Sequence, residues 1–419
     1  MSQLLLLVES NTTGTGREFA RRGVELGVQP VLITADPTRY PYVEQDQLPS
    51  VRTDTSSATD VLATARSLAG AAEIVGVTSS SEYYVATAAE TAHALGLPGP
   101  SAEAVRGCRH KGVQRRRLAG AGVAVPRFAL VTTEAQALAA ARETGFPVVV
   151  KPVQGSGSVG VRLCRDAHEA AEHAAGLFAA AAGERGLLVA GEVLVEAYVP
   201  GREFSVELFG DEVVMTVAKH VGPLPDFVEV GHDLPAVLDP AQETLLTHCA
   251  LSAVASLRLG WGAAHVELRM DGAYPLVIEV NPRLAGGMIP ELIRRARGID
   301  LIRAQVAAAI GRPVPLDAGA AAEASIRFLT AARSGRLAGV APAISAATAV
   351  DDVVDVTVYG RTGDRVEAPA DFRGRLGHVI AVSDRDGGAS TAADRGLTHL
   401  QDAVVYRASA GTSGDGTAA

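Results

Sequence analysis

The feature that most restricts the fold of this chain is a β-branched run that ends in a lysine and leads into a glycine-rich loop. Val148–Val150 precede Lys151, a loop from Gly155 to Gly160 is rich in glycine and serine, and a second apolar stretch ends at Leu163. This pattern predicts a hairpin with a flexible tip. Glycines let backbone amides approach phosphate oxygens, serine hydroxyls add donors, and Lys151 adds a compact positive charge. The lysine precedes the glycines, so this is not a Walker loop. A hairpin that is merely flexible is the alternative.

The first hundred residues have the pattern of a small parallel α/β unit. Short apolar runs at Leu4–Val8, Val31–Ile33 and Ile74–Thr78 alternate with amphipathic stretches, which predicts buried parallel strands joined by helices. The turn of residues 10–16 follows the first run and opens a helix, so its backbone N–H groups could face an anion. It lacks the complete dinucleotide fingerprint, and a plain tight turn is the preferred interpretation.

The overall composition argues against several functions. A formal net charge of −9 disfavours a general nucleic-acid binder, because such proteins need Lys and Arg over a broad surface. The densest basic run, Arg115–Arg117, is interpreted as a solvated helix face. The apolar run at the start is far too short for a signal peptide or a membrane span, so a membrane is not an expected partner. The net charge likewise means that nucleic acid is not an expected partner. Three separated cysteines without zinc or disulfide spacing fit a cytoplasmic location.

A second hairpin is predicted within residues 263–283. With period-two alternation, His265 and Glu267 share one face of its first strand, and Glu279 and Asn281 share one face of the second. An antiparallel pairing that sets the two glutamates opposite each other puts the loop at residues 271–275, centred on residue 273. Asp-Gly and Pro in that stretch suit a loop. The residues expected on the apolar face are Val266, Leu268, Ile278 and Val280.

Two facing carboxylates should repel and raise each other's pKa, an arrangement that survives more readily when a divalent cation neutralises them. Oxygen ligands alone favour magnesium or manganese over zinc. Asn281 would add a neutral oxygen, and Arg283 follows where it could hold a transferring phosphoryl group. A solvent-facing hairpin with two ordinary glutamates is the alternative.

Between the two hairpins, residues 194–208 are predicted to form a strand, a bend and another strand. The backbone of the bend at Ala197–Val199 suits the edge of an adenine, and Glu203 could accept hydrogen bonds from ribose hydroxyls, although an edge strand fits the spacing equally well. Upstream, Lys111 in a helix-like segment could meet a phosphate from another side. An ordinary surface lysine is the alternative.

The order of these motifs resembles the ATP-grasp superfamily of carboxylate–amine ligases, closely over residues 105–312 and more loosely elsewhere. The resemblance implies that ATP converts a carboxylate into an acyl phosphate, that an amine displaces the phosphate, and that no side-chain nucleophile is needed. The implied catalytic residues are Lys151 and Arg283. The implied ATP ligands are Lys111, Lys151, Gly155, Ser156, Gly157, Ser158, Gly160, Glu196, Ala197, Val199 and Glu203, and the implied ligands of Mg²⁺ (or Mn²⁺) are Glu267, Glu279 and Asn281.

Two further segments resemble substrate-facing parts of ligases that join amino acids. One contains Glu229, which could hold an α-amino group, and His232; the other runs from Arg283 to Gly286 and Gly287, whose amides could approach a carboxylate. Ordinary loop residues are the alternative for each. The expected partners are therefore a small-molecule carboxylate and an amine, with an amino acid or dipeptide preferred. A different acid from secondary metabolism or purine-like biosynthesis, or a non-catalytic ATP-binding regulator, are the other hypotheses.

The predicted fold class is multidomain α/β and α+β. It comprises an N-terminal βαβ (pre-ATP-grasp) domain at 1–104, a central ATP-grasp domain of two α+β subdomains at 105–312, a mostly β C-terminal domain at 313–407 and a flexible tail at 408–419. Ser101, a candidate helix N-cap, follows the first break. Dimers are common in the resembling family, so a homodimer is a further expectation.

Overall fold

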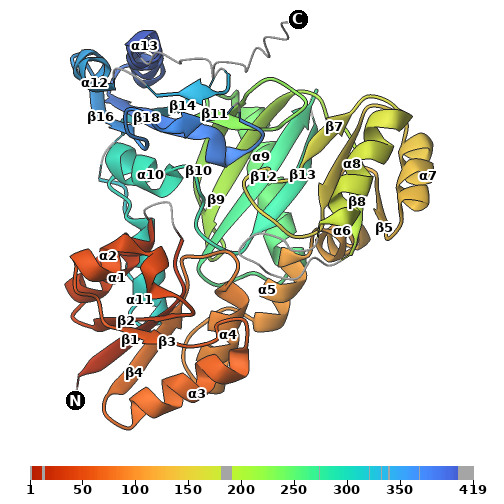
Figure 1. Ribbon diagram of the computed structural model, residues 1–419. Coiled ribbons are helices and arrows are strands. Elements are labelled where there is room, and N and C mark those ends of the chain that lie inside the picture. Colours follow the sequence, from red (N-terminus) through yellow and green to blue (C-terminus); the bar gives the residue numbers. More distant parts are fainter. Residues whose placement is uncertain are drawn as a thin grey trace, which may run out of the picture. The chain divides into compact units, whose positions relative to one another are not determined.

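The computed structural model describes residues 2–11, 15–180, 191–272, 274–319, 321–331, 333–337, 340–367 and 369–403 (Figure 1). They form two compact units. The first is built from residues within 1–156, 160–219 and 234–321, and the second from residues within 157–159, 220–233 and 322–419. The predicted tail at 408–419, the centre of the 10–16 turn and the predicted loop centre at residue 273 lie outside the described residues. Within the described part, no helix has the length and apolar character needed to cross a bilayer.

The first unit begins with a parallel sheet of order β3-β2-β1-β4. All three predicted apolar runs are strands of this sheet, and the short β3 is the strand that the sequence did not predict. Leu5 and Leu6 are fully buried, so the inner strand is covered on both faces, as parallel sheets require. The elements are β1 (Gln3–Val8), α1 (Thr15–Glu25), β2 (Gln29–Thr34), η1 (Pro37–Arg39), α2 (Pro41–Gln45), β3 (Ser50–Arg52), α3 (Ala58–Ala69), β4 (Glu73–Thr78) and α4 (Val85–Ala94).

A second sheet in this unit has the order β5-β8-β6-β7 and contains the predicted glycine-loop hairpin. Strands β6 and β7 pair antiparallel, which confirms that hairpin, and α7 and α8 pack on the sheet. Ser101 caps α5 by accepting the Ala104 N–H at 3.3 Å, as predicted. The elements are α5 (Ala102–Arg109), α6 (Lys111–Gly120), β5 (Phe128–Val131), α7 (Glu134–Thr144), β6 (Val148–Pro152), β7 (Arg162–Cys164), α8 (Ala167–Ala179) and β8 (Val193–Ala197).

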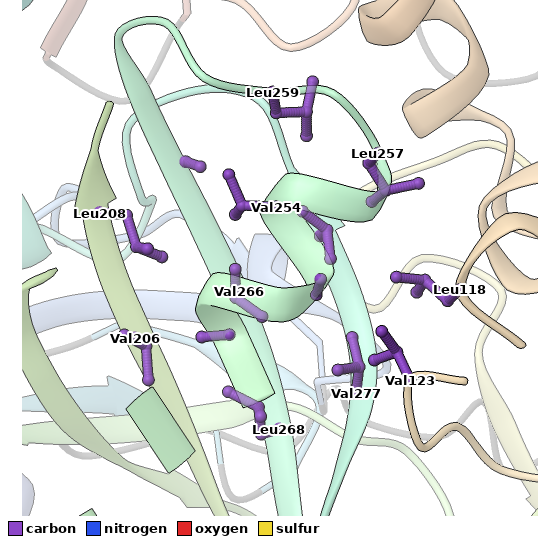
Figure 2. Close-up of a cluster of buried hydrophobic side chains, with 14 of the residues drawn as sticks. Leu118, Val123, Val206, Leu208, Val254, Leu257, Leu259, Val266, Leu268 and Val277 are labelled. Atoms are coloured by element: carbon purple, nitrogen blue, oxygen red, sulfur yellow. The ribbon is translucent and has the colours of Figure 1, made fainter. Parts of the chain in front are cut away.

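Four antiparallel strands, in the order β13-β12-β9-β10, carry the main core of the first unit. Helix α9 lies across them, and Figure 2 shows Val254 of the helix facing Val266 and neighbouring apolar side chains of the strands. The elements are β9 (Arg202–Phe209), β10 (Glu212–Val221), α9 (Pro240–Ser256), β12 (Ala263–Asp271), β13 (Tyr274–Asn281), α10 (Ile289–Arg297) and α11 (Leu301–Ala309).

The predicted apolar face of the second hairpin is wrong at one position. Glu267 pairs with Glu279, but Leu268 pairs with Val277, so the register shifts and Ile278 becomes the extra residue of a β-bulge. Val277 is therefore fully buried, whereas Ile278 is only half-buried. The strands also extend to Asp271 and resume at Tyr274, leaving a shorter loop than predicted.

Val266→Thr is expected to lower the free energy of unfolding by about 1–3 kcal/mol. Threonine has nearly the same shape as valine, but it places a hydroxyl group in the apolar core. Val266 has no exposed surface. Urea unfolding curves would measure the change. The matched control is Val213→Thr on β10, where the valine side chain is exposed and little loss is expected. Equal losses for both variants would contradict the prediction.

The second unit combines strands in the order β11-β14-β18-β16 with helices that pack on them. The C-terminal part was predicted as mostly β, and its two helices, which cover β14, β16 and β18, were not predicted. The domain boundaries given above stay predictions. The elements are β11 (Glu229–Leu234), β14 (Glu323–Thr330), β15 (Gly335–Arg336), α12 (Val340–Thr348), β16 (Val353–Val358), β17 (Arg365–Val366), η3 (Phe372–Gly374), β18 (Arg375–Ser383) and α13 (Gly388–Ala403).

Candidate active site

All three lysines of the 419-residue sequence are buried in the first unit, each beside a carboxylate. Lys111, Lys151 and Lys219 are between 4% and 6% exposed. Their Nζ atoms lie 3.0 Å from Glu279, 2.5 Å from Glu196 and 2.8 Å from Glu267, respectively. An ammonium group is rarely buried unless it is paired, because losing its hydration is costly. The chain therefore places every lysine where a compact positive charge has a specific neighbour, which the surface-lysine alternative for Lys111 did not foresee.

The predicted phosphate ligand Lys151 belongs to a buried triad. Glu196 on the adjacent strand β8 accepts hydrogen bonds from Lys151 and from the Nε of Arg115 on α6. Burial lowers the pKa of Lys151, and Glu196 offsets this only partly. Burial alone would raise the pKa of Glu196, but Arg115 and Lys151 lower it below its usual value. The Glu196 carboxylate therefore faces two cations, Arg115 and Lys151, and its predicted contact with adenine stays a prediction.

The interpretation of Arg115–Arg117 as a solvated face is wrong for Arg115. Its side chain is fully buried, and its guanidinium donates to Glu196 and to the Ile278 carbonyl. Arg116 is exposed, as expected. Neighbouring residues on a helix point in different directions, so one of the three faces the core, and two acceptors from distant strands make that burial tolerable.

The two facing glutamates lie as predicted. Glu267 and Glu279 are paired across β12 and β13, and Asn281 lies opposite His265. The Oε1 atom of Glu267 is 2.8 Å from Lys219 and 3.0 Å from His265 Nε2, and the other ring nitrogen of His265 is 2.7 Å from Glu207.

The pKa expectation for this pair was wrong for Glu267. Burial by itself raises the pKa of Glu267, but Lys219 and His265 lower it well below its usual value. Burial lowers the pKa of His265, yet Glu207 and Glu267 together raise it to about 9. Lys219 and His265 thus stabilise the charged form of this carboxylate.

The donor set fits magnesium bound together with a phosphate ligand. Across the residues that the structure describes, no cluster of three or more His, Cys, Asp or Glu side chains could hold a metal by itself. Glu267, Glu279 and Asn281 instead offer two carboxylates and an amide on one hairpin. Mg²⁺ is usually held by one or two carboxylates plus substrate phosphates rather than by an all-protein cage. The three residues therefore suit an ion that arrives with a nucleotide.

Arg283 follows β13 and lies against a carboxylate that the sequence reasoning missed. Its Nε donates to Glu82 Oε2 at 3.0 Å, its Nη2 donates to the same oxygen, and its Nη1 donates to the Leu284 carbonyl at 2.9 Å. Glu82 is 8% exposed and comes soon after β4. The sequence did contain a signal for Glu82 as a site residue. Glu82 is an acidic residue just beyond a buried parallel strand, and the carboxyl ends of such strands commonly form ligand sites.

The base of the glycine loop is tied down within the first unit. Lys111 Nζ donates to the Gly155 carbonyl at 2.9 Å, and the Ser156 and Tyr83 hydroxyls lie 3.1 Å apart. Gly155 and Gly160 have positive φ values of 139° and 71°, which favour glycine.

The tip of the loop, Gly157–Val159, packs with the second unit. Ser158 Oγ donates to the Phe227 carbonyl at 2.7 Å. A Cβ atom on Gly157 would lie 2.3 Å from the Phe372 ring, so a side chain does not fit there. The loop residues thus have defined neighbours, and their predicted contacts with ATP stay predictions.

The predicted adenine and ribose ligands already have protein partners. The Ala197 N–H donates to the Arg127 carbonyl, and the Val199 carbonyl accepts from Arg269 at 2.9 Å. The Glu203 carboxylate lies between Lys219 at 3.0 Å and Arg269 at 2.9 Å. A ribose bound by Glu203 would have to share that carboxylate with two cations.

The four predicted substrate residues besides Arg283 fall into both units. Glu229 and His232 belong to the second unit. Glu229 is ion-paired with Arg375 at 3.0 Å, and His232 is fully buried, with its ring in a T-shaped contact with the Phe328 ring. Gly286 and Gly287 belong to the first unit, in the turn between β13 and α10. Gly287 has a φ of 58°, which suits glycine in that turn.

Comparison with known families decides the assignment. The model of the ATP-grasp domain matches residues 144–291, and the model of the L-amino acid ligase C-terminal domain 2 matches residues 327–404. This chain belongs to the ATP-grasp superfamily of ligases. The resemblance inferred from motif order and the fold class are confirmed, and the protein is an enzyme of the ADP-forming carbon–nitrogen ligase group. The regulatory hypothesis is thereby set aside.

Individual relatives of this ATP-grasp ligase agree with the family models. It is 37% identical over 400 residues to the uncharacterized protein y4rH of Sinorhizobium fredii (strain NBRC 101917 / NGR234), covering 96% of this chain and 83% of the relative. Human carnosine synthase 1 is 33% identical over 235 residues, which cover 52% of this chain and 28% of that protein. The L-amino acid ligase of Bacillus licheniformis has the same fold, with a TM-score of 0.78 and 21% identity over 97% of this chain and 99% of that one.

Proposed function

We propose that this ATP-grasp ligase joins an amino acid to an amine through an acyl-phosphate intermediate, forming an amide or peptide bond and releasing ADP and phosphate. The observation that carries the proposal is the gathering of Lys111, Lys151, Arg283 and the facing glutamates Glu267 and Glu279 in one compact unit. The match to an L-amino acid ligase domain supports an amino acid as substrate. The cytoplasmic location and the homodimer stay predictions.

In the proposed reaction, the buried cations bind and orient the phosphates of ATP. Lys111 and Lys151 would hold them beside the glycine loop, and Arg283 would lie next to the γ-phosphate. Glu267, Glu279 and Asn281 would hold Mg²⁺, which when bound neutralises charge on the phosphates. A carboxylate oxygen of the acid takes the γ-phosphoryl group, and ADP leaves. The amine then attacks the acyl carbon, and phosphate leaves from the tetrahedral intermediate; fixed positive charge and positioning supply the acceleration.

The test is ATP-dependent phosphate release with Mg²⁺ across a matrix of amino acids, offered singly and in pairs. We expect release with particular pairs, together with ADP and the matching amide, and loss of release in Glu279→Ala. The matched control is Glu212→Ala at the exposed start of β10, which should retain the wild-type rate. Release with other carboxylates but with no amino acid would contradict the proposed substrate, and release that persists in Glu279→Ala would contradict the assigned metal site.

A further inference from the structure

The N-terminal parallel sheet contributes a carboxylate to the candidate site at the point where ligands usually approach such a sheet. In the order β3-β2-β1-β4, the chain leaves β1 towards β2 on one side, while β4 lies on the other side. Open α/β sheets bind ligands at this kind of switch point, just outside the carboxyl ends of the strands. The Asn11 N–H donates to Ser80 Oγ at 3.2 Å and so links the segments that follow β1 and β4. Glu82 lies in the second of these segments.

Glu82 fixes the orientation of the Arg283 guanidinium. One carboxylate oxygen accepts from both Nε and Nη2 of Arg283, while Nη1 donates to the Leu284 carbonyl. A guanidinium has five N–H donors, one on Nε and two on each terminal nitrogen. With these contacts made, one N–H on Nη1 and one on Nη2 remain for an oxyanion. Donors on both terminal nitrogens can serve two oxygens of a phosphoryl group.

Glu82 also lies between two arginines, Arg109 and Arg283, and offsets their positive charge. Its second oxygen lies 3.9 Å from Arg109 Nη1. Burial lowers the pKa of Arg109, Glu82 raises it and Arg283 lowers it, so the two guanidinium groups act on each other. Burial alone raises the pKa of Glu82, but Arg283 and Arg109 lower it below its usual value. Removing this negative charge would leave two guanidinium groups without the carboxylate that they share.

We propose that Glu82 is a positioning residue that holds Arg283 in the orientation needed to bind the transferring phosphoryl group. The inference rests on the proposed function, in which Arg283 lies beside the γ-phosphate. It gives the segment after β4 of the N-terminal parallel sheet an indirect part in phosphoryl transfer, because Glu82 acts on Arg283 and not on the substrate.

The test compares the affinity for MgADP with that for the magnesium complex of AMP-PNP, a non-hydrolysable ATP analogue that carries the γ-phosphate. Both dissociation constants are measured by calorimetry for the wild type, Glu82→Gln, Arg283→Lys and the double variant. We expect Glu82→Gln to reduce the preference for AMP-PNP over ADP by about tenfold, the effect of losing one hydrogen bond to a charged group. The ADP affinity should stay the same, and Glu82→Gln should have no further effect on the preference in the Arg283→Lys background.

The matched control is Asp300→Asn, which removes the negative charge from a comparable pair in the same unit, Arg22 with Asp300 at 2.7 Å. It should leave the preference unchanged. An unchanged preference in Glu82→Gln, an equal loss of affinity for both nucleotides, or the same loss in the Arg283→Lys background would each overturn the positioning role. Absence of phosphate release by the wild type with every amino-acid pair would refute the proposed function instead, since the nucleotide measurements need no acid or amine.

Discussion

Lys151→Met is expected to lower the maximal rate of ATP-dependent phosphate release by about 10²–10³-fold, the loss typical when one fixed donor to a developing anion is removed. Methionine keeps most of the length of the side chain but carries no charge. The fold should tolerate the change, because Glu196 keeps its buried partner Arg115. The measurement is the maximal rate with the best amino-acid pair found in the matrix, together with a thermal unfolding curve that checks the fold.

The matched control for this variant is Arg116→Met, which removes a cation from the exposed side of α6. Its rate should equal that of the wild type. A Lys151→Met enzyme that is well folded and retains most of its rate would contradict the assignment of Lys151 to the phosphates.

Glu196→Gln is expected to lower the free energy of unfolding by about 3–5 kcal/mol, because it leaves Arg115 and Lys151 buried without the carboxylate between them. Glutamine has the same shape, so the loss reports on charge and not on a cavity. Urea unfolding monitored by circular dichroism would measure it. Adding Arg115→Met to Glu196→Gln should recover part of the loss, since a neutral side chain then replaces one of the two cations.

The control is Glu18→Gln on α1, which breaks an ion pair with Arg21 whose side chains are 31% and 50% exposed. Exposed pairs of this kind contribute about 1 kcal/mol or less. If Glu196→Gln lost no more stability than Glu18→Gln, the triad would not be the stabilising feature that its burial suggests.

Most local features of the fold could be predicted from the sequence. The two hairpins follow from period-two alternation and from glycine or Asp-Gly at their turns, and these signals act over a few residues. The pairing of Glu267 with Glu279 does not follow from the loop alone. The pairs next to the loop, such as Leu268 with Val277, would by themselves set Ile278 opposite Glu267, and the bulge at Ile278 restores the predicted pairing. That bulge could not be predicted, because the burial of Val277 depends on packing against α9 and not on the alternation.

The partners of the site residues were much harder to predict. Arg115 is separated by 81 residues from Glu196, and Glu82 by 201 residues from Arg283, so only the tertiary fold brings each pair together. The same limit explains the wrong pKa expectation for Glu267. Reasoning confined to one hairpin considered the facing carboxylate but not Lys219, which comes from another strand. Whether a charged side chain can be buried therefore depends on partners that are distant in the sequence.

The burial of every lysine also decides how the lysine side chains of the protein respond to chemical reagents. Lys111, Lys151 and Lys219 together expose very little surface, and each is held by a carboxylate. An acylating reagent or a lysine-specific protease therefore meets no lysine side chain in open solvent while the chain is folded. Covalent labelling of a lysine would instead report local opening around one of these buried ion pairs, so each pair carries its own chemical marker.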